Sequence, residues 1–278
     1  MKKITRRSFL AAAGLTAAAL ALTACGGSSS STASSTASSA ASSEAASSNA
    51  AAELTTVEAG KLTMATNAAF PPYEMTTDTG AFEGIDVDTA QAIAEKLGLE
   101  LQIDDMDFDA ALLSVQQGKA DIVMAGVTVT DERKAVMDFS DSYATGIQSI
   151  IVPEGSDIAT PDDLAGKKIG TQRGTTGYIY CSDDFGDENV VAYDDGLTAV
   201  QALNNGQVDA VVIDNAPAKE FIAANPGLVI LDTSYAEEDY AIGMAKGSAL
   251  EDAINATLEE LKADGTLQSI VDKYITAE

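Results

Sequence analysis

The sequence contains no histidine and only two cysteines, Cys25 and Cys181. Histidine is the commonest general base and metal ligand, so its absence argues against much hydrolytic and metal-dependent chemistry. Cys25 is expected to carry lipid, for reasons given below, which leaves Cys181 without a partner for an intrachain disulfide. We expect Cys181 to be a small buried or half-buried side chain. We expect no cofactor, no bound metal and no catalytic residue.

Basic residues are scarce: 16 Lys and Arg stand against 43 Asp and Glu, a net charge of −27. Residues 1–24 hold four cations and no acids, so removing them changes this charge to −31. A field of that sign argues against binding to nucleic acid and against direct contact with anionic lipid. Long apolar runs are scarce too, since no segment after the first 24 residues is suited to crossing a membrane.

The amino terminus has the pattern of a secretion signal. Residues 9–22 are mostly apolar, but they fall short of the ~18 to 20 apolar residues that span a bilayer. We therefore expect residues 1–24 to be a signal peptide. Thr5–Leu10, TRRSFL, resembles a twin-arginine export signal, but two arginines also fit an ordinary positive region, so Sec and twin-arginine export both stay open. Four cations precede the apolar stretch: Lys2, Lys3, Arg6 and Arg7.

The segment after this signal indicates a lipid anchor. Leu22, Thr23 and Ala24 precede Cys25, and this resembles the lipobox of bacterial lipoproteins, in which the signal is cut before a cysteine that receives lipid such as palmitate. Residues 26–52 are Gly, Ser, Thr or Ala except at two positions, a composition that cannot offset its backbone entropy by burial. We expect 25–53 to be the lipidated cysteine and a disordered tether. The protein would be anchored to the cell membrane on its extracytoplasmic face, through lipid only.

The remaining chain is organised around AGVTVTDER at 125–133 and VVIDN at 211–215. Each ends a short apolar run typical of a buried strand, and each then presents a charge, Arg133 in the first and Asp214 in the second. A guanidinium pairs well with a carboxylate and a carboxylate with an ammonium, so a zwitterion such as an α-amino acid would satisfy both. The alternative is that Arg133 lies on a solvated helix start and Asp214 caps a helix.

An internal repeat favours the first interpretation. Residues 114–126 read SVQQGKADIVMAG and residues 202–214 read ALNNGQVDAVVID, at a constant offset of 88. Both comprise a helix end, a glycine, an aspartate, an apolar strand and then a candidate ligand group. Two similar α/β units are predicted, and ligands of such sheets bind beyond the carboxyl ends of the strands.

Three other segments are candidates for walls of the same cleft. NAAFPPYE at 67–74 is a proline-stiffened loop that carries Phe70 and Tyr73, and Phe108 begins a predicted helix. GIDVDTAQAIAEKLG at 84–98 is a strongly periodic helix for which Asp86 is expected to be the cap. QRGTTG at 172–177 is either a plain capping turn or an anion site at a helix start.

Taken together, these residues resemble a known family. TNAAFPPYEM, GIDVDTAQAIAEKLG, the run 108–143 and DAVVIDN are similar to family 3 of the bacterial solute-binding proteins, the amino-acid receptors of ABC importers, over nearly all of 57–275. The resemblance implies an α/β, two-lobed, periplasmic-binding-protein-like fold (type II) with a two-segment hinge near 144–148 and 237–241. It also implies a monomer that passes its amino acid to the ABC permease subunits. Lobe 1 would comprise 54–146 and 239–278, and lobe 2 would comprise 147–238.

The resemblance also implies roles for particular residues. Arg133 would take the ligand carboxylate with the Thr128 hydroxyl and amide, and Asp214 with the Gly126 carbonyl would take the ammonium. Phe70 and Phe108 would sandwich the ligand side chain, with Asn67 near its tip. The full expected set of ligand-binding residues is Asn67, Phe70, Tyr73, Phe108, Ala125, Gly126, Thr128, Arg133, Gln172, Thr175, Thr176 and Asp214.

The identity of the ligand stays open at this stage. Asn67 and Gln172 are neutral and favour a polar, uncharged side chain, whereas Glu74 could serve a basic amino acid if it faces inward. Arg173 is not assigned a role. The alternative from another class is an enzyme such as a cyclohexadienyl-type dehydratase, but the cleft lacks a nucleophile beside a base. A sensor domain is also disfavoured, since no span or output domain follows Glu278 in this sequence.

Overall fold

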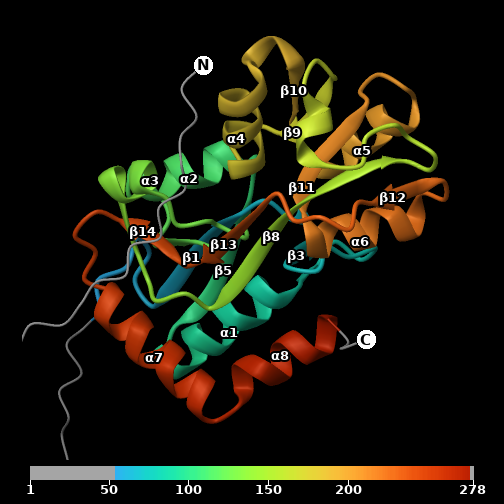
Figure 1. The fold of residues 1–278 in the computed structure, drawn as a ribbon. Helices are drawn as coiled ribbons and strands as arrows, with labels where there is room; N and C mark the ends of the chain where they lie inside the picture. Colours follow the sequence, from blue (N-terminus) through green and yellow to red (C-terminus); the bar gives the residue numbers. More distant parts are fainter. Residues whose placement is uncertain (1–53, 276–278) are drawn as a thin grey trace, which may run out of the picture. The chain divides into compact units, whose positions relative to one another are not determined.

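A computed structural model of the chain describes residues 54–275. The predicted signal peptide, Cys25 and the tether up to residue 53 lie outside the described residues. Among residues 54–275, no helix has the length and apolar character needed to cross a membrane. The described chain contains two large sheets, each flanked by helices, which belong to the same compact unit (Figure 1).

The first sheet has five strands in the order β5-β1-β6-β14-β7. β1 runs parallel to β5 and β6, and β14 runs antiparallel to β6 and β7. A small sheet, β2-β3-β4, follows β1 in the chain. The bounds of these strands are β1 Lys61–Thr66, β2 Ala69–Phe70, β3 Glu74–Thr76, β4 Phe82–Glu83, β5 Glu100–Asp105, β6 Ile122–Val123, β7 Met137–Phe139 and β14 Gly243–Ala245.

The second sheet has the order β10-β9-β11-β8-β12, and β13 pairs with a further part of β8. β9 runs parallel to β10 and β11, whereas β8 runs antiparallel to β11, β12 and β13. Its strands are β8 Ala144–Pro153, β9 Ile169–Gln172, β10 Val190–Tyr193, β11 Ala210–Asp214, β12 Leu228–Ile230 and β13 Ala236–Tyr240. The long strand β8 lies beside β13 in Figure 1.

Helices pack on both sheets and are bounded by recognisable caps. The side chains of Thr130, Thr175 and Asp195 each accept a backbone N–H at the start of a helix. α7 and α8 lie against α1 (Figure 1). The helices are α1 Ile85–Leu97, α2 Phe108–Gln116, α3 Asp131–Val136, α4 Thr176–Phe185, α5 Gly196–Asn204, α6 Asn215–Ala224, α7 Glu251–Ala263 and α8 Thr266–Tyr274, with 3₁₀ turns at Pro161–Leu164 and Asp187–Asn189.

The chain passes between the two sheets at two adjacent places. Residues 140–143 lead from β7 to β8, and residues 241–242 lead from β13 back to β14. The two segments are joined, because the Tyr143 N–H donates to the Tyr240 carbonyl at 3.0 Å and Ala144 is in register with Tyr240. β13 and β14 therefore follow each other closely in the chain but belong to different sheets.

The start of helix α1 differs from the prediction that Asp86 caps it. Its apolar face, including Val87, Ala90 and Ile93, is buried as the periodicity predicts, and Gly98 ends it in the left-handed conformation with φ 71°. However, the N-cap is Gly84, and the carboxylate of Asp86 is fully buried rather than capping the helix. Asp86 lies in the first turn, where its side chain faces the interior.

Cys181 lies in α4 and is fully buried in the apolar core of the second sheet. Burial raises the pKa of its thiol to about 12, with the charge of Asp184 acting in the same direction. The thiol is therefore protonated at neutral pH and unreactive.

Candidate functional site

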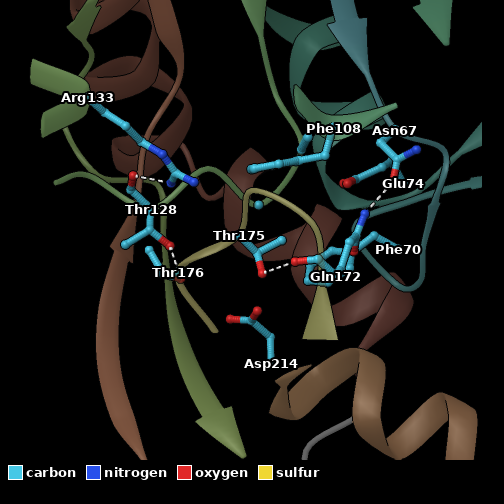
Figure 2. A pocket seen from close by; sticks show the side chains of 12 residues that line it. Asn67, Phe70, Glu74, Phe108, Thr128, Arg133, Gln172, Thr175, Thr176 and Asp214 are labelled. Carbon is cyan, nitrogen blue, oxygen red and sulfur yellow. Dashed lines mark hydrogen bonds between the residues drawn. The ribbon is translucent and has the colours of Figure 1, made fainter. Parts of the chain in front are cut away.

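A cavity lies beyond the carboxyl ends of strands from both sheets, as expected for α/β units. The space between its lining atoms amounts to about 300 Å³, with the part open to solvent included, and Figure 2 shows the side chains around it. The structure brings together all the expected residues except Tyr73, and it adds Glu74. The lining residues are Asn67, Phe70, Glu74, Phe108, Ala125, Gly126, Thr128, Arg133, Gln172, Thr175, Thr176 and Asp214.

Arg133 supplies the positive charge of the cavity. It lies in the first turn of α3, where Thr130 accepts its backbone N–H at 3.2 Å, but its side chain is only 8% exposed and does not lie on a solvated face. The guanidinium donates to the carbonyls of Thr128 at 2.7 Å and Gly174 at 3.1 Å, and it lies 5.4 Å above the Phe108 ring. Guanidinium has five N–H donors, so these two bonds to carbonyls leave donors for a carboxylate.

The electrostatic surroundings of Arg133 are those of a buried cation. Burial lowers the pKa of its guanidinium, and the charge of Glu238 is the largest influence in the opposite direction. The group stays ionised, because an arginine pKa is far above neutral pH. An anion placed beside it would therefore compensate a charge that has already lost most of its hydration.

Asp214 supplies a negative charge at the end of β11. It occupies the N-cap position of α6, yet its side chain accepts no capping bond and is only 7% exposed. One carboxylate oxygen accepts from the Tyr240 hydroxyl, and the other accepts from Gln148 Nε2 at 2.8 Å. Burial raises the pKa of Asp214 to about 7, although the bond from Tyr240 opposes that rise. A cation bound beside Asp214 would stabilise its ionised form.

Glu238 is a buried carboxylate that the sequence reasoning did not identify. It lies on β13, and one of its oxygens accepts from the hydroxyls of Thr128 at 3.0 Å and Thr176 at 2.9 Å and from Gln148 Nε2 at 3.0 Å. The hydroxyl expected to touch a ligand, that of Thr128, is thus already engaged. The alternation of side chains along β13 indicates its burial, since Glu238 and Tyr240 are two residues apart, share one face of the strand and are both buried.

Gly126 and Asp86 form the junction between the first sheet and α1. Gly126 has φ 55°, and a Cβ there would lie 2.9 Å from Cε1 of Phe70, so glycine is required. Its N–H donates to one oxygen of Asp86 at 3.0 Å, and the Tyr143 hydroxyl donates to the other at 2.7 Å. Burial raises the pKa of Asp86 to about 6, although both of these hydrogen bonds favour the ionised form.

The amide side chains of the cavity connect its two sides. Gln172, at the end of β9, donates through Nε2 to Oδ1 of Asn67 at 2.8 Å, and Asn67 in turn donates to the Met106 carbonyl at 3.0 Å. The Thr175 hydroxyl donates to the Gln172 carbonyl at 2.8 Å and also caps α4 (Figure 2). Arg173 points elsewhere: it is 54% exposed and pairs with Asp194 at 3.5 Å.

Tyr73 departs from the expectation that it lines this cavity. Its ring is 5% exposed, lies 5.9 Å from the Phe70 ring and meets Tyr240 edge to face at 5.2 Å. It lines a neighbouring cavity on the other side of Asp214 and Tyr240. Tyr73 therefore packs outside the cavity against Phe70 and against Tyr240, the residue whose hydroxyl donates to Asp214.

Glu74 is fully buried and faces the cavity. Neither of its oxygens receives an N–H or O–H from residues 54–275. Among the titratable groups, the carboxyl of Asp86 has the strongest influence on Glu74. Burial raises the pKa of Glu74 well above its usual value, and the charges of Asp86 and Asp214 act in the same direction.

Within residues 54–275, no group of three His, Cys, Asp or Glu side chains is arranged to hold a metal ion.

Comparison with known proteins gives a consistent picture. The family model for bacterial extracellular solute-binding proteins, family 3, matches residues 62–277. The chain is 32% identical to the L-cystine-binding protein TcyJ of Escherichia coli (strain K12) over 226 residues, covering 80% of this chain and 85% of the relative. It is also 32% identical to the arginine-binding extracellular protein ArtP of Bacillus subtilis (strain 168), covering 78% and 87%.

A solved structure has the same fold. The arginine-, lysine-, histidine-binding protein ArtJ of Geobacillus stearothermophilus superposes with a TM-score of 0.75 at 34% identity, covering 78% of this chain and 96% of that chain. The expected α/β, two-lobed fold of a periplasmic binding protein is therefore confirmed at the level of fold class.

Proposed function

This chain belongs to family 3 of the bacterial extracellular solute-binding proteins, and we propose that it binds one free amino acid with a basic side chain in the cavity described above. It is an extracytoplasmic receptor of an ABC importer and not an enzyme, in keeping with relatives that are named as binding proteins. The observation that carries the proposal is the pair of buried, opposite charges, Arg133 and Asp214, that line a single cavity.

At one end of the cavity, Arg133 holds the ligand carboxylate. Its guanidinium is held by the Thr128 carbonyl and by the Phe108 ring, both within residues 54–146, so it is already oriented before the lobes close. The hydroxyls of Thr128 and Thr176 already donate to Glu238. The donors that these two residues offer to the ligand carboxylate are therefore their backbone N–H groups.

At the other end, Asp214 holds the ligand ammonium together with the Gly126 carbonyl. Tyr240 and Gln148 donate to the two Asp214 oxygens and hold the carboxylate in place. The side chain of the ligand then lies between Phe70 and Phe108. Both rings are largely buried, at 6% and 5% exposure, and so form rigid apolar walls.

Glu74 is the reason to favour a basic amino acid. The expectation of a polar, uncharged ligand rested on the neutral amides of Asn67 and Gln172, with Glu74 left open. Glu74 faces the cavity without a donor from the described chain, so a guanidinium or ammonium on the ligand side chain would supply what it lacks. The names of ArtP and ArtJ, which include arginine, support the same class of ligand, whereas that of TcyJ supports cystine as the alternative.

Calorimetry with the twenty amino acids and cystine tests this proposal. We expect Arg133→Ala to weaken binding by about 2 to 5 kcal/mol, because the ligand carboxylate would be buried without a partner. Arg173→Ala is the matched control, since it removes an exposed arginine outside the cavity, and its affinity should equal that of the unaltered protein. Equal affinity for the Arg133 variant would reject the site, and no binding of any amino acid would reject the function.

We also propose lobe boundaries and a hinge. Lobe 1 comprises 54–146 and 239–278, lobe 2 comprises 147–238, and the paired segments around β8 and β13 are the hinge. Bonds between the lobes, such as Gln172 to Asn67 and Arg133 to the Gly174 carbonyl, are then broken when the lobes open. Small-angle scattering should show a smaller radius of gyration after ligand is added.

Anchoring and assembly complete the proposal. Residues 1–24 are removed by signal cleavage, Cys25 carries the lipid, and the folded receptor acts as a monomer that docks on the permease subunits. Cys25→Ala should move the protein from the membrane fraction to the soluble fraction without changing its affinity for ligand. Retention of this variant in the membrane would contradict lipid anchoring.

A further inference from the structure

Glu74 is a buried acid with no cationic neighbour in the described chain to stabilise its charge. It belongs to β3, is fully buried and lines the cavity. The positive charge among the lining residues is that of Arg133, whose guanidinium is bound to the carbonyls of Thr128 and Gly174. A buried carboxylate without a hydrogen-bond donor or a cation is costly, and such a group is normally neutral.

The titratable groups that influence Glu74 are acids and phenols. Asp86 on α1 is the nearest in effect, and it already has two donors of its own, the Gly126 N–H at 3.0 Å and the Tyr143 hydroxyl at 2.7 Å. Asp86 is thus the acid whose charge is stabilised by hydrogen bonds, and Glu74 is the acid that is neutral in the empty site. Across the elements packed around it, the titratable groups that interact with Glu74 are Asp86, Asp105, Asp214, Tyr73 and Tyr143.

We infer that Glu74 exchanges a proton for the cationic side chain of the ligand, so that a basic amino acid binds with release of a proton and a neutral amino acid binds without that release. In the empty site the carboxyl of Glu74 is protonated. When a guanidinium or ammonium enters, Glu74 loses its proton to solvent and its carboxylate accepts N–H donors from the ligand. The inference rests on the proposed function, and it adds a dependence of ligand selection on pH.

This exchange makes affinity for a basic ligand rise with pH. The proton must leave before the ion pair forms, so binding is favoured when protons are scarce, by up to about tenfold per pH unit. Asp214 also releases protons when the ligand ammonium binds, because its own pKa is raised to about 7. That contribution is common to basic and neutral amino acids, and it cancels when the two are compared.

Calorimetry in buffers of different ionisation enthalpy measures the number of protons released. L-arginine and L-glutamine should be titrated into the full receptor at pH 7 in phosphate and in Tris. We expect L-arginine to release about one proton more than L-glutamine, the amount assigned to Glu74. Equal proton release for the two ligands would overturn the inference while leaving the amino-acid receptor intact. Binding of neutral amino acids alone would overturn it as well, and binding of no amino acid would reject the proposed function itself.

Two variants locate the proton. Glu74→Gln keeps the shape of the neutral acid but cannot ionise, so it should weaken L-arginine binding at least about 30-fold and abolish the extra proton release. Glu83→Gln removes the same charge from β4 of the same small sheet, where the side chain is exposed, and it should release protons as the unaltered protein does. Extra proton release that persists in Glu74→Gln would assign the exchange to another group and overturn the inference.

Discussion

The two halves of the internal repeat share their construction but end in different chemistry. In the first, α2 ends before Gly118 and β6 leads to Gly126, and in the second, α5 ends before Gly206 and β11 leads to Asp214. Gly118 and Gly206 have φ values of 65° and 66°, and each lies in a turn closed by equivalent backbone bonds. The two repeats thus share the same helix, turn and strand and differ in the residue at their last position, Gly126 or Asp214.

The aspartates within the two repeats both accept hydrogen bonds from backbone N–H groups, but one carboxylate is buried and the other is exposed. Asp121 accepts the backbone N–H groups of Val57 at 2.7 Å and Thr63 at 2.8 Å and is 7% exposed. Asp209 accepts the N–H of Lys168 at 2.7 Å and is exposed. Each ties its own strand to the start of a neighbouring parallel strand. The internal positions of the repeat therefore join strands to each other, whereas its last position lines the cavity.

The last positions should show the largest effect. Asp214→Asn should weaken binding of a basic amino acid by about 2 to 5 kcal/mol, because a buried ammonium would lose its charged partner. Asp209→Asn, on the same repeat, should leave affinity unchanged at 25 °C. Isothermal calorimetry checks both. Equal losses in the two variants would contradict the division between ligand and scaffold positions.

The next effect is on stability as a function of pH. The pKa of Asp214 is raised by burial to about 7, above its value in the unfolded chain, so the folded state holds more protons. This contribution is fully present below about pH 4 and is lost as the pH rises through about 7. We expect the empty protein to lose on the order of 1 to 3 kcal/mol more between pH 5 and pH 8 than Asp214→Asn does, as measured by urea unfolding. An identical pH dependence would contradict the assigned pKa.

The internal aspartates should differ in their effect on stability. Asp121→Asn removes one of the two oxygen acceptors that serve the buried Thr63 N–H and the part-buried Val57 N–H, and it should cost about 2 kcal/mol. Asp209→Asn affects one exposed bond and should cost about 1 kcal/mol or less. Chemical denaturation of each variant checks the order. A larger loss of stability for Asp209→Asn than for Asp121→Asn would show that burial of the carboxylate does not decide its contribution to stability.

The glycines should show the smallest effect and no difference between the repeats. A Cβ at Gly118 or Gly206 meets nothing within 4 Å, so alanine introduces only the strain of a positive φ. Each substitution should cost about 1 kcal/mol, with unchanged ligand affinity. A thermal melt of both variants checks this expectation. Costs that differ clearly between the two would mean that the turns are not equivalent.

Much of this architecture could be predicted from the sequence, because periodicity and turn residues are local signals. The helix at 85–97, the strand that leads to Gly126 and the strand that ends at Asp214 follow from such patterns. The burial of Asp86, the bonds of Glu238 and the position of Tyr73 behind Phe70 could not be predicted. They depend on which long-range neighbours approach, and a carboxylate on a helix start or a strand reads as a cap or a surface group until those neighbours are known.

The central claim is that Arg133 holds the carboxylate of a zwitterion whose ammonium lies beside Asp214. A double cycle of calorimetric titrations tests it directly, with L-arginine and agmatine, the amine that lacks the carboxylate, titrated into the unaltered protein and into Arg133→Ala. We predict that the unaltered protein prefers L-arginine by at least about 30-fold and that Arg133→Ala loses this preference. An undiminished preference in the variant would contradict the claim.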